Sequence, residues 1–390
     1  MTDVMVVAGA RTAIGDYGGA FKDVAPTKLG SIAIKEAITR AKVDPASVGH
    51  VVMGSVIHGE ARDMYLSRVA ALDAGVPVGT PCLTVNRLCG SGLQAIVSAA
   101  QHILLGDTNI TVAGGAESMS RAAYMLPSGR WGQRMGDAPV IDAMTAALHD
   151  PFGHGHMGVT AENIAAKYGF TREQQDQFAV ESHRRAARAM QAGYFREQIV
   201  PVELKSKKGV EQFTTDEHVR ADASMENMAK LKAVFKKDGT VTAANASGIN
   251  DAAAAVVLMD AKAAKNYKPM ARLVAYAHAG VEPQLMGLGP IPAVKRVFEK
   301  AGLKPADMDV IESNEAFAVQ AMAVTKDLGL DPAKVNPNGG AVALGHPIGA
   351  TGCILTVKAL YELARINKRY ALVTMCIGGG QGIAAIFERV

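Results

Sequence analysis

The sequence predicts an α/β fold made of two similar halves, with a further segment inserted between them. Three observations support this prediction. Short apolar runs alternate with helical stretches along the 390 residues, which is typical of helices layered on sheets. A stretch near the C-terminus repeats the pattern of a stretch near the N-terminus. The region between these repeats has a more polar composition.

The predicted strands are short, apolar and often β-branched, as strands in a buried sheet usually are. Two stretches between them have helical periodicity. Residues 29–42 form one, and residues 93–105 form the other, with Leu93, Ile96 and Val97 on one face. The predicted strands are residues 4–8, 51–53, 110–113, 256–259, 272–275, 310–311, 371–375 and 383–387.

The repeat relates residues 41–52 (AKVDPASVGHVV) to residues 301–312 (AGLKPADMDVIE) at a constant offset of 260. The alignment pairs Pro45 with Pro305, and each segment reads as a helix end, a turn and a strand. A chance match of a common unit is the alternative interpretation. The repeat predicts two halves, which are residues 1–119 plus 243–268, and residues 269–390.

Residues 120–242 are predicted to be an inserted loop domain that folds over the layered core. They contain the single tryptophan of the sequence, Trp131, and loops rich in Gly and His. Thr171 and Gln174 form a capping box that predicts the start of a helix, and Gly193 is expected to end it.

Composition excludes several classes of protein. The net charge of +4 argues against a dedicated nucleic-acid binder. The N-terminus lacks the pattern of a signal peptide, and no apolar run approaches the roughly 18 residues of a membrane span. The four cysteines show no CxxC spacing, so reduced thiols and a cytoplasmic location are expected.

Cys89 and His346 are the first candidates for chemistry. Cys89 lies where a loop becomes the helix after Ser91, and a helix N-terminus favours thiolate over thiol. His346 stands between Gly345 and Pro347, and histidine is the usual base that activates a cysteine. The alternatives are an inert buried thiol and a histidine that only forms hydrogen bonds.

Two further candidates follow predicted strands. Asn314, in the stretch ESNEAF, is a neutral donor and acceptor that suits a bound water or a carbonyl group. Cys376 ends an apolar run, and Gly378, Gly379 and Gly380 follow it. Backbone N–H groups that carry no side chain can point at a developing oxyanion.

Together these stretches resemble the thiolases, the acyl-CoA C-acetyltransferases. NRLCGSG, NEAF, GHPIGATG and CIGGGQG match the catalytic blocks of that family in order, and the likeness runs from VVAGARTAIG to GIAAIFERV. The resemblance is closest to bacterial β-ketothiolases of broad chain length. It implies two βαβαβ halves packed as a five-layer αβαβα core with an inserted loop domain.

The resemblance also implies roles. Cys89 corresponds to the nucleophile that is acylated, and His346 to its base and to one donor of an oxyanion hole. Asn314 corresponds to the residue that holds a water in that hole. Cys376 corresponds to the general acid and base, and the Gly378 N–H to a donor of a second hole. The implied reaction is a reversible, ping-pong Claisen condensation of acetyl-CoA with a short acyl-CoA, and its reverse, thiolysis.

The resemblance places the coenzyme A site in and near the inserted segment. Coenzyme A is a substrate here, and no cofactor or metal is expected. Lys230, Lys232, Lys236 and Lys237 suit a polyanion, or else form a solvated helix face. His149, His154 and His156 lack further residues at ligand spacing. The implied contacts are Leu148, His156, Met157, Arg220, Phe235, Ser247, Met286, Ala316 and Phe317.

Three other functions compete with this interpretation. A decarboxylating condensing enzyme shares the fold but lacks a cysteine at the position of Cys376. A non-catalytic acyl-CoA-binding protein would be expected to lack Cys89 or His346. A dithiol redox protein would leave His346 and Asn314 without a role. A homotetramer, built as a dimer of dimers, is the expected assembly.

Overall fold

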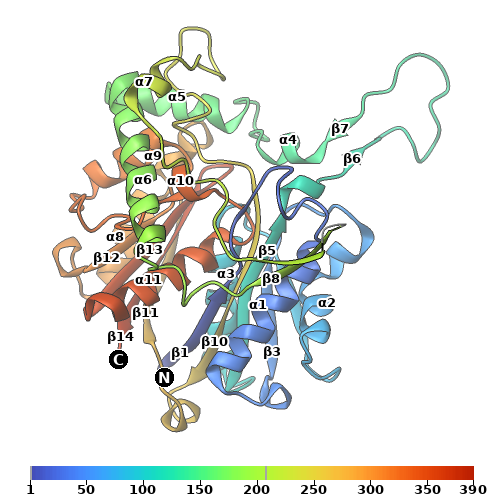
Figure 1. Cartoon of the computed structure of the whole chain (residues 1–390), viewed down its shortest axis with the longest axis vertical. Coiled ribbons are helices and arrows are strands. Elements are labelled where there is room, and N and C mark those ends of the chain that lie inside the picture. Colours follow the sequence, from blue (N-terminus) through green and yellow to red (C-terminus); the bar gives the residue numbers. More distant parts are fainter. Residues whose placement is uncertain (1, 207–208) are drawn as a thin grey trace.

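The computed structural model describes residues 2–206 and 209–390. Its centre is a mixed ten-stranded sheet in the order β12-β13-β14-β11-β1-β10-β5-β3-β4, with the short strand β2 (Gly15–Asp16) paired to β10. The sheet divides between the two halves of the sequence where β1 and β11 meet. Figure 1 shows the N-terminal half, apart from the yellow-brown β10, in blue and cyan beside the C-terminal half in orange and red.

The N-terminal half contains β1 (Val4–Arg11), β10 (Asn250–Asp260), β5 (Ile110–Ser118), β3 (His50–Gly54) and β4 (Cys82–Val85). β10 lies antiparallel between β1 and β5, whereas β3 lies parallel to β5 and β4. β4 was not expected from the sequence. It is a short, only partly buried edge strand, so it lacks the apolar run that marked the others.

The C-terminal half repeats this pairing with β11 (Ala271–Gly280), β14 (Gln381–Arg389), β13 (Tyr370–Ile377) and β12 (Val310–Ser313). β14 is antiparallel to both β11 and β13, and β13 is parallel to β12. β12 therefore occupies the position in its half that β3 occupies in the other half, and the two strands begin 260 residues apart, which is the offset of the sequence repeat. The two halves join through antiparallel pairs such as Val4 with Leu273.

Helices form three layers around these strands. α3 (Ser91–Leu105) and α11 (Thr351–Ile366) pack on each other in the middle, and each also contacts strands of its own half. α1 (Pro26–Ala41) and α2 (Leu66–Asp73) cover the outside of the N-terminal half, and α8 (Pro290–Ala301) covers β11 and β14. The predicted layered α/β core is confirmed (Figure 1).

Of the two inner helices, α3 forms where the sequence predicts a helix, at residues 93–105. Both are rich in Leu, Ile, Val and Ala, and both are largely buried. α3 ends at Gly106, whose φ of 81° is the left-handed conformation that glycine adopts without strain. The segment Leu88–Leu105 is long and apolar enough to cross a membrane by composition alone, yet 56% of it is buried inside the protein. It is a core helix, and its start carries Cys89.

The inserted segment lies over one end of this core. Its longest helix, α6, begins with the predicted capping box, in which Thr171 and Gln174 exchange hydrogen bonds of 3.2 and 2.9 Å. The loop between β6 and β7 extends far from the body (Figure 1). The elements of the segment are β6 (Tyr124–Met125), β7 (Ile141–Asp142), α4 (Ala143–Ala147), α5 (Met157–Tyr168), α6 (Arg172–Gln191), β8 (Val202–Ser206), β9 (Gly209–Phe213) and α7 (Met225–Ala229).

Two short helices of the C-terminal half complete the surroundings of the site. α9 (Ala318–Asp327) follows Phe317, and α10 (Ala341–Leu344) leads into the loop that carries His346. The exact domain boundaries, at residues 119, 242 and 268, stay a prediction.

Candidate active site

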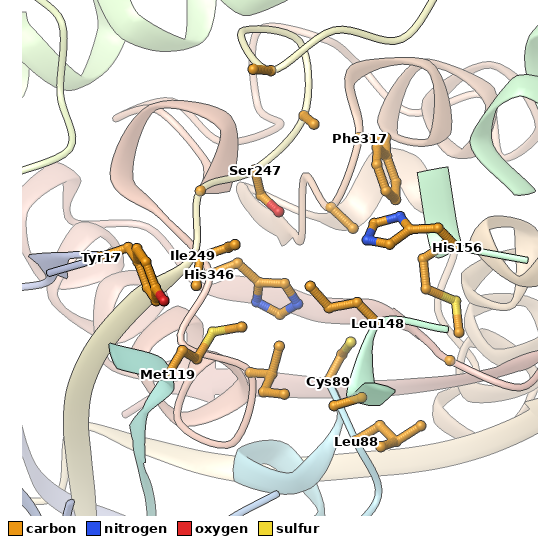
Figure 2. A pocket seen from close by; sticks show the side chains of 18 of the residues that line it. Tyr17, Leu88, Cys89, Met119, Leu148, His156, Ser247, Ile249, Phe317 and His346 are labelled. Atoms are coloured by element: carbon orange, nitrogen blue, oxygen red, sulfur yellow. The ribbon is translucent and has the colours of Figure 1, made fainter. Parts of the chain in front are cut away.

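A cavity of about 400 Å³ opens between the two halves and the inserted segment. The thiol of Cys89 and the imidazole of His346 point into the same space, with Ser247, His156 and Phe317 across from them (Figure 2). Cys89 comes from the N-terminal half, and His346 comes from the C-terminal half. The cavity therefore brings together residues that lie far apart in the sequence.

A tight turn presents Cys89 to the cavity. Leu88, the residue before it, has a φ of 44°, a left-handed conformation that is uncommon for leucine. Asn86 Oδ1 accepts the N–H of Leu88 at 2.9 Å. Ser91 Oγ accepts the N–H of Arg87 at 2.8 Å and donates to the carbonyl of Leu88 at 2.7 Å. These bonds hold the turn, and α3 begins directly after it.

The Cys89 thiol is less acidic than the helix-start argument predicted. Burial raises its pKa to about 11, whereas the N–H groups of Gly378 and of Cys89 itself lower it by hydrogen bonding to the sulfur. The prediction of a favoured thiolate is wrong because desolvation outweighs the helix N-terminus. Cys89 is therefore a thiol at neutral pH and needs a base to become a nucleophile.

His346 is prepared to be that base. The backbone N–H of His346 donates to Asn250 Oδ1 at 2.9 Å, and this bond fixes the loop. Its Nδ1 lies 2.7 Å from Thr351 Oγ1, and that hydroxyl donates its hydrogen to the carbonyl of Pro347 at 2.9 Å. Nδ1 must therefore carry the proton, which leaves a lone pair on Nε2. Burial lowers the pKa of His346 to about 4, so the ring is neutral.

Asn314 lies beside the unprotonated nitrogen of His346. It follows β12 and is fully buried. Its Nδ2 donates to His346 Nε2 at 3.4 Å. Within residues 2–206 and 209–390, no group hydrogen-bonds Asn314 Oδ1. A buried acceptor without a partner is costly, so this oxygen suits a bound water or substrate.

Cys376 is buried within β13, one residue before the strand ends. Burial raises the pKa of its thiol strongly, and the nearby Cys89 raises it further. The two sulfurs thus interact, and each makes ionisation of the other less favourable. At neutral pH Cys376 is a protonated thiol that can serve as an acid before it serves as a base.

The glycines after Cys376 leave room where other residues would collide. A Cβ on Gly378 would lie 3.0 Å from Leu88 Cδ1 and 3.2 Å from Met157 Cε. Gly380 has a φ of 85°, and a Cβ there would lie 2.3 Å from the carbonyl oxygen of Val281. Bare backbone at Gly378 lets its N–H reach the sulfur of Cys89.

The contacts implied for coenzyme A lie around the cavity, with one exception. His156 stacks on Phe235 with ring centroids 4.6 Å apart, and burial lowers its pKa to about 4. Arg220 does not line the cavity. It is exposed, and its Nη2 lies 3.2 Å from Asp16 Oδ2 at the rim. The contacts that line the cavity are Leu148, His156, Met157, Phe235, Ser247, Met286, Ala316 and Phe317.

Other lining residues were missed by the sequence reasoning. Leu88, Val234 and Gly248 are direct neighbours of predicted residues, so adjacency could have found them. Asp16, Tyr17, Met119, Ile249 and Ile348 also line the cavity. No local signal marks these five, because the folding of distant segments brings them there.

The three histidines considered for a metal do not converge on one point. His149 and His156 meet edge to face with centroids 5.2 Å apart, and His149 Nδ1 lies 2.8 Å from the carbonyl of Thr145. In the part of the chain that the structure describes, no group of three or more His, Cys, Asp or Glu side chains is arranged to hold a metal ion.

Comparison with known proteins agrees with this arrangement. The family model described as "Thiolase, N-terminal domain" matches residues 4–262, and "Thiolase, C-terminal domain" matches residues 267–389. The chain is 65% identical to the beta-ketothiolase BktB of Cupriavidus necator, with 100% of this chain and 99% of the relative covered. It is 50% identical to an acetyl-CoA acetyltransferase of the same organism, with both chains fully covered.

A solved structure gives the same result for the fold. Human mitochondrial 3-ketoacyl-CoA thiolase is 45% identical, with a TM-score of 0.98 over 100% of this chain and 99% of that one. Its structure in complex with CoA has a TM-score of 0.97 at 44% identity, over 100% of this chain and 98% of that one. The predicted fold and resemblance are confirmed: the chain belongs to the thiolase family.

Proposed function

We propose that the chain is an acyl-CoA C-acyltransferase that joins acetyl-CoA to acetyl-CoA or to another short acyl-CoA, and that also cleaves 3-ketoacyl-CoA with CoA. The groups that surround the Cys89 sulfur support this proposal most directly. Two backbone N–H groups, from Gly378 and Cys89, point at it. The neutral imidazole of His346 shares the cavity and has its lone pair on Nε2.

The first half-reaction acylates Cys89. His346 Nε2 takes the thiol proton as the sulfur attacks the thioester carbonyl of an acyl-CoA. The carbonyl oxygen becomes an oxyanion, and the N–H groups of Cys89 and Gly378 stabilise it. When the carbon–sulfur bond to CoA breaks, Cys376 gives its proton to the leaving thiolate. The products are acyl-Cys89, free CoA, a Cys376 thiolate and a protonated His346.

The second half-reaction forms the carbon–carbon bond. The Cys376 thiolate takes a proton from the methyl group of a second acetyl-CoA. The enolate oxygen accepts hydrogen bonds from protonated His346 Nε2 and from a water held by Asn314 Oδ1. The enolate carbon attacks the Cys89 thioester, whose oxyanion again faces the two backbone N–H groups. Cys89 leaves as a thiolate and recovers its proton from His346.

The apolar cavity supports binding of the pantetheine arm and the acyl group. Met157, Met286 and Phe317 line it, and Ser247 adds a hydroxyl. The human relative was solved with CoA bound. We propose that Arg220 contacts the nucleotide end of CoA from the rim, because its guanidinium is exposed beside Asp16.

The acyl group is proposed to extend beyond acetyl, to at least the five-carbon 3-ketoacyl substrate. Two flexible methionine side chains, Met157 and Met286, lie in the cavity wall and can adapt to longer chains. The likeness to BktB, which is named a beta-ketothiolase, supports this.

A homotetramer in the cytoplasm is proposed as the working form. The β6–β7 loop presents Trp131 and Met135, each 90% exposed, together with Tyr124, Met125 and Leu126. A second exposed apolar group consists of Met64 and Tyr65, directly before α2, and Leu83, on the edge strand β4 that α2 contacts. Exposed apolar groups of this size are typical of interfaces, and two separate ones suit a dimer of dimers.

The test is the covalent intermediate. Incubation with acetyl-CoA alone is expected to add one acetyl group to the intact protein, which peptide mapping places on Cys89. Cys89→Ala is expected to lose the adduct and all turnover. An acetyl group on Cys82 or Cys353, or none at all, would refute the proposal. Condensation from acetyl-CoA alone also separates this function from a decarboxylating enzyme, which needs a carboxylated donor.

A further inference from the structure

A fully buried carboxylate lies beside the site, and neither the proposed chemistry nor the sequence motifs account for it. Glu117 stands near the end of β5. Its Oε2 accepts the N–H groups of Val56 at 3.1 Å and Gly349 at 2.8 Å, and its Oε1 accepts the N–H of Ile57 at 3.1 Å. Three converging N–H donors suit a carboxylate.

One of these three bonds crosses between the halves. Glu117 belongs to the N-terminal half, as do Val56 and Ile57, whereas Gly349 belongs to the loop that carries His346. The bond therefore joins the half that supplies the nucleophile to the half that supplies its base.

The backbone around this contact is cleared of side chains. A Cβ on Gly115 would lie 2.1 Å from the carbonyl oxygen of Gly349, and a Cβ on Gly54 would lie 2.8 Å from it. A Cβ on Gly349 would lie 2.5 Å from Glu117 Oε2. Glycines on β3 and β5 thus let the His346 loop settle against the N-terminal half, where Glu117 holds it.

Two titratable groups interact with Glu117. Burial raises the pKa of its carboxyl group to about 8 and the nearby Asp251 contributes to the rise, whereas the three backbone N–H groups lower it. Glu117 is therefore charged in the pH range in which Cys89 titrates. The pKa of Cys89 is raised first by burial, and the charge of Glu117 also raises it. Glu117 and the Cys89 thiol are thus coupled electrostatically.

We propose that Glu117 is a positioning residue for the acyl-transfer reaction: its carboxyl group fixes the His346 loop, through the Gly349 N–H, against the half that carries Cys89. The proposal rests on the proposed function, in which His346 takes the proton of Cys89. Asn250 also holds this loop, at the backbone N–H of His346, so loss of the Gly349 bond would remove one of two anchors and leave His346 Nε2 at a more variable distance from the sulfur. Displacements of about 1 Å can cost roughly 100-fold in rate.

Glu117→Gln is the direct test, because it keeps the size of the side chain but places an NH2 group against at least one backbone N–H. We expect kcat for thiolysis to fall roughly 10- to 100-fold while KM changes little. The pH profile of Cys89 alkylation by iodoacetamide should move to lower pH, since a charge that raises the thiol pKa is gone. Backbone hydrogen exchange in residues 345–350 should become faster.

Two comparisons make the test specific. Glu117→Asp keeps the charge but is one methylene shorter, so it should lower kcat while the alkylation profile stays close to wild type. Asp309→Asn is the matched control. Asp309 also accepts two backbone N–H groups, from Arg369 and Tyr370, but it lies at the opposite end of β12 from Asn314. Its kinetics should stay at the wild-type values.

Acetylation of the wild-type protein by acetyl-CoA separates failure of this inference from failure of the proposed function. If wild type is acetylated on Cys89 and Glu117→Gln keeps a kcat within about twofold, the positioning role is wrong and the function stands. An unmoved alkylation profile, or a KM that rises as much as kcat falls, also overturns it. If Glu117→Gln does not fold, Glu117→Asp decides, and a wild-type kcat in that variant overturns the inference.

Discussion

Removing one hydroxyl group, in Thr351→Val, should disable the base without touching the nucleophile. Valine has nearly the shape of threonine, so packing at the start of α11 is kept. What is lost is the acceptor for the Nδ1–H of His346, at 2.7 Å. The carbonyl of Pro347 also loses its donor at 2.9 Å, although it can still accept from the N–H groups of Ala350 and Thr351.

The magnitude follows from the buried N–H group. A buried donor that loses its partner costs about 1–3 kcal/mol. His346 can escape that cost by moving its proton to Nε2, but this tautomer has no lone pair for the Cys89 proton. Because about 1.4 kcal/mol corresponds to a factor of ten, the population of the tautomer that is protonated on Nδ1 should fall by roughly 5- to 150-fold.

The assay is single-turnover acetylation of Cys89, followed by quenching and intact-protein mass measurement. Thr351→Val should acetylate more slowly by the factor above, and Thr351→Ser, which restores the hydroxyl, should recover most of the rate. Wild-type acetylation in Thr351→Val would refute the assignment of the proton to Nδ1. So would a serine variant no faster than the valine variant.

Three other outcomes are expected. Cys376→Ala should still acquire acetyl on Cys89, but condensation should fall at least ~100-fold, because a positioned general base is lost; a near-normal condensation rate would assign the proton transfer to another group. Gly378→Ala should reduce thiolysis of five-carbon relative to four-carbon substrates by roughly tenfold, because its Cβ crowds Leu88 and Met157; an unchanged ratio of the two rates would place the acyl group elsewhere. His278, 2.8 Å from Gln94, is half-buried, and desolvation lowers its pKa from 6.5 to about 4, so its contribution to stability should be lost as pH falls from about 6.5 through 4. Urea unfolding at several pH values should show a smaller acid loss in His278→Gln, and equal slopes would contradict this.

The layers and the resemblance to the thiolases could be predicted from the sequence because both depend on local patterns. Apolar alternation marks strands, and NRLCGSG or GHPIGATG are contiguous segments. What the sequence could not predict depends on contacts between distant segments. Glu117 meets Gly349 across 232 positions, and Asp16 meets Arg220 across 204. Neither pair has a periodic signature.

The prediction that Cys89 favours the thiolate was wrong for a related reason. Helix position can be read from sequence, whereas desolvation depends on every neighbour that folding supplies. Burial, which no local pattern reports, decided the sign of the pKa shift.

The two inner helices begin 260 residues apart, at Ser91 and Thr351, which is the offset that relates the sequence repeats. The hydroxyl of each lies in the first turn of its helix and holds the segment just before it. In one copy it braces the backbone turn at Leu88 that presents a sulfur, and in the other it orients the imidazole of His346. Helix starts at equivalent positions of the two halves thus support the nucleophile in one half and the base in the other.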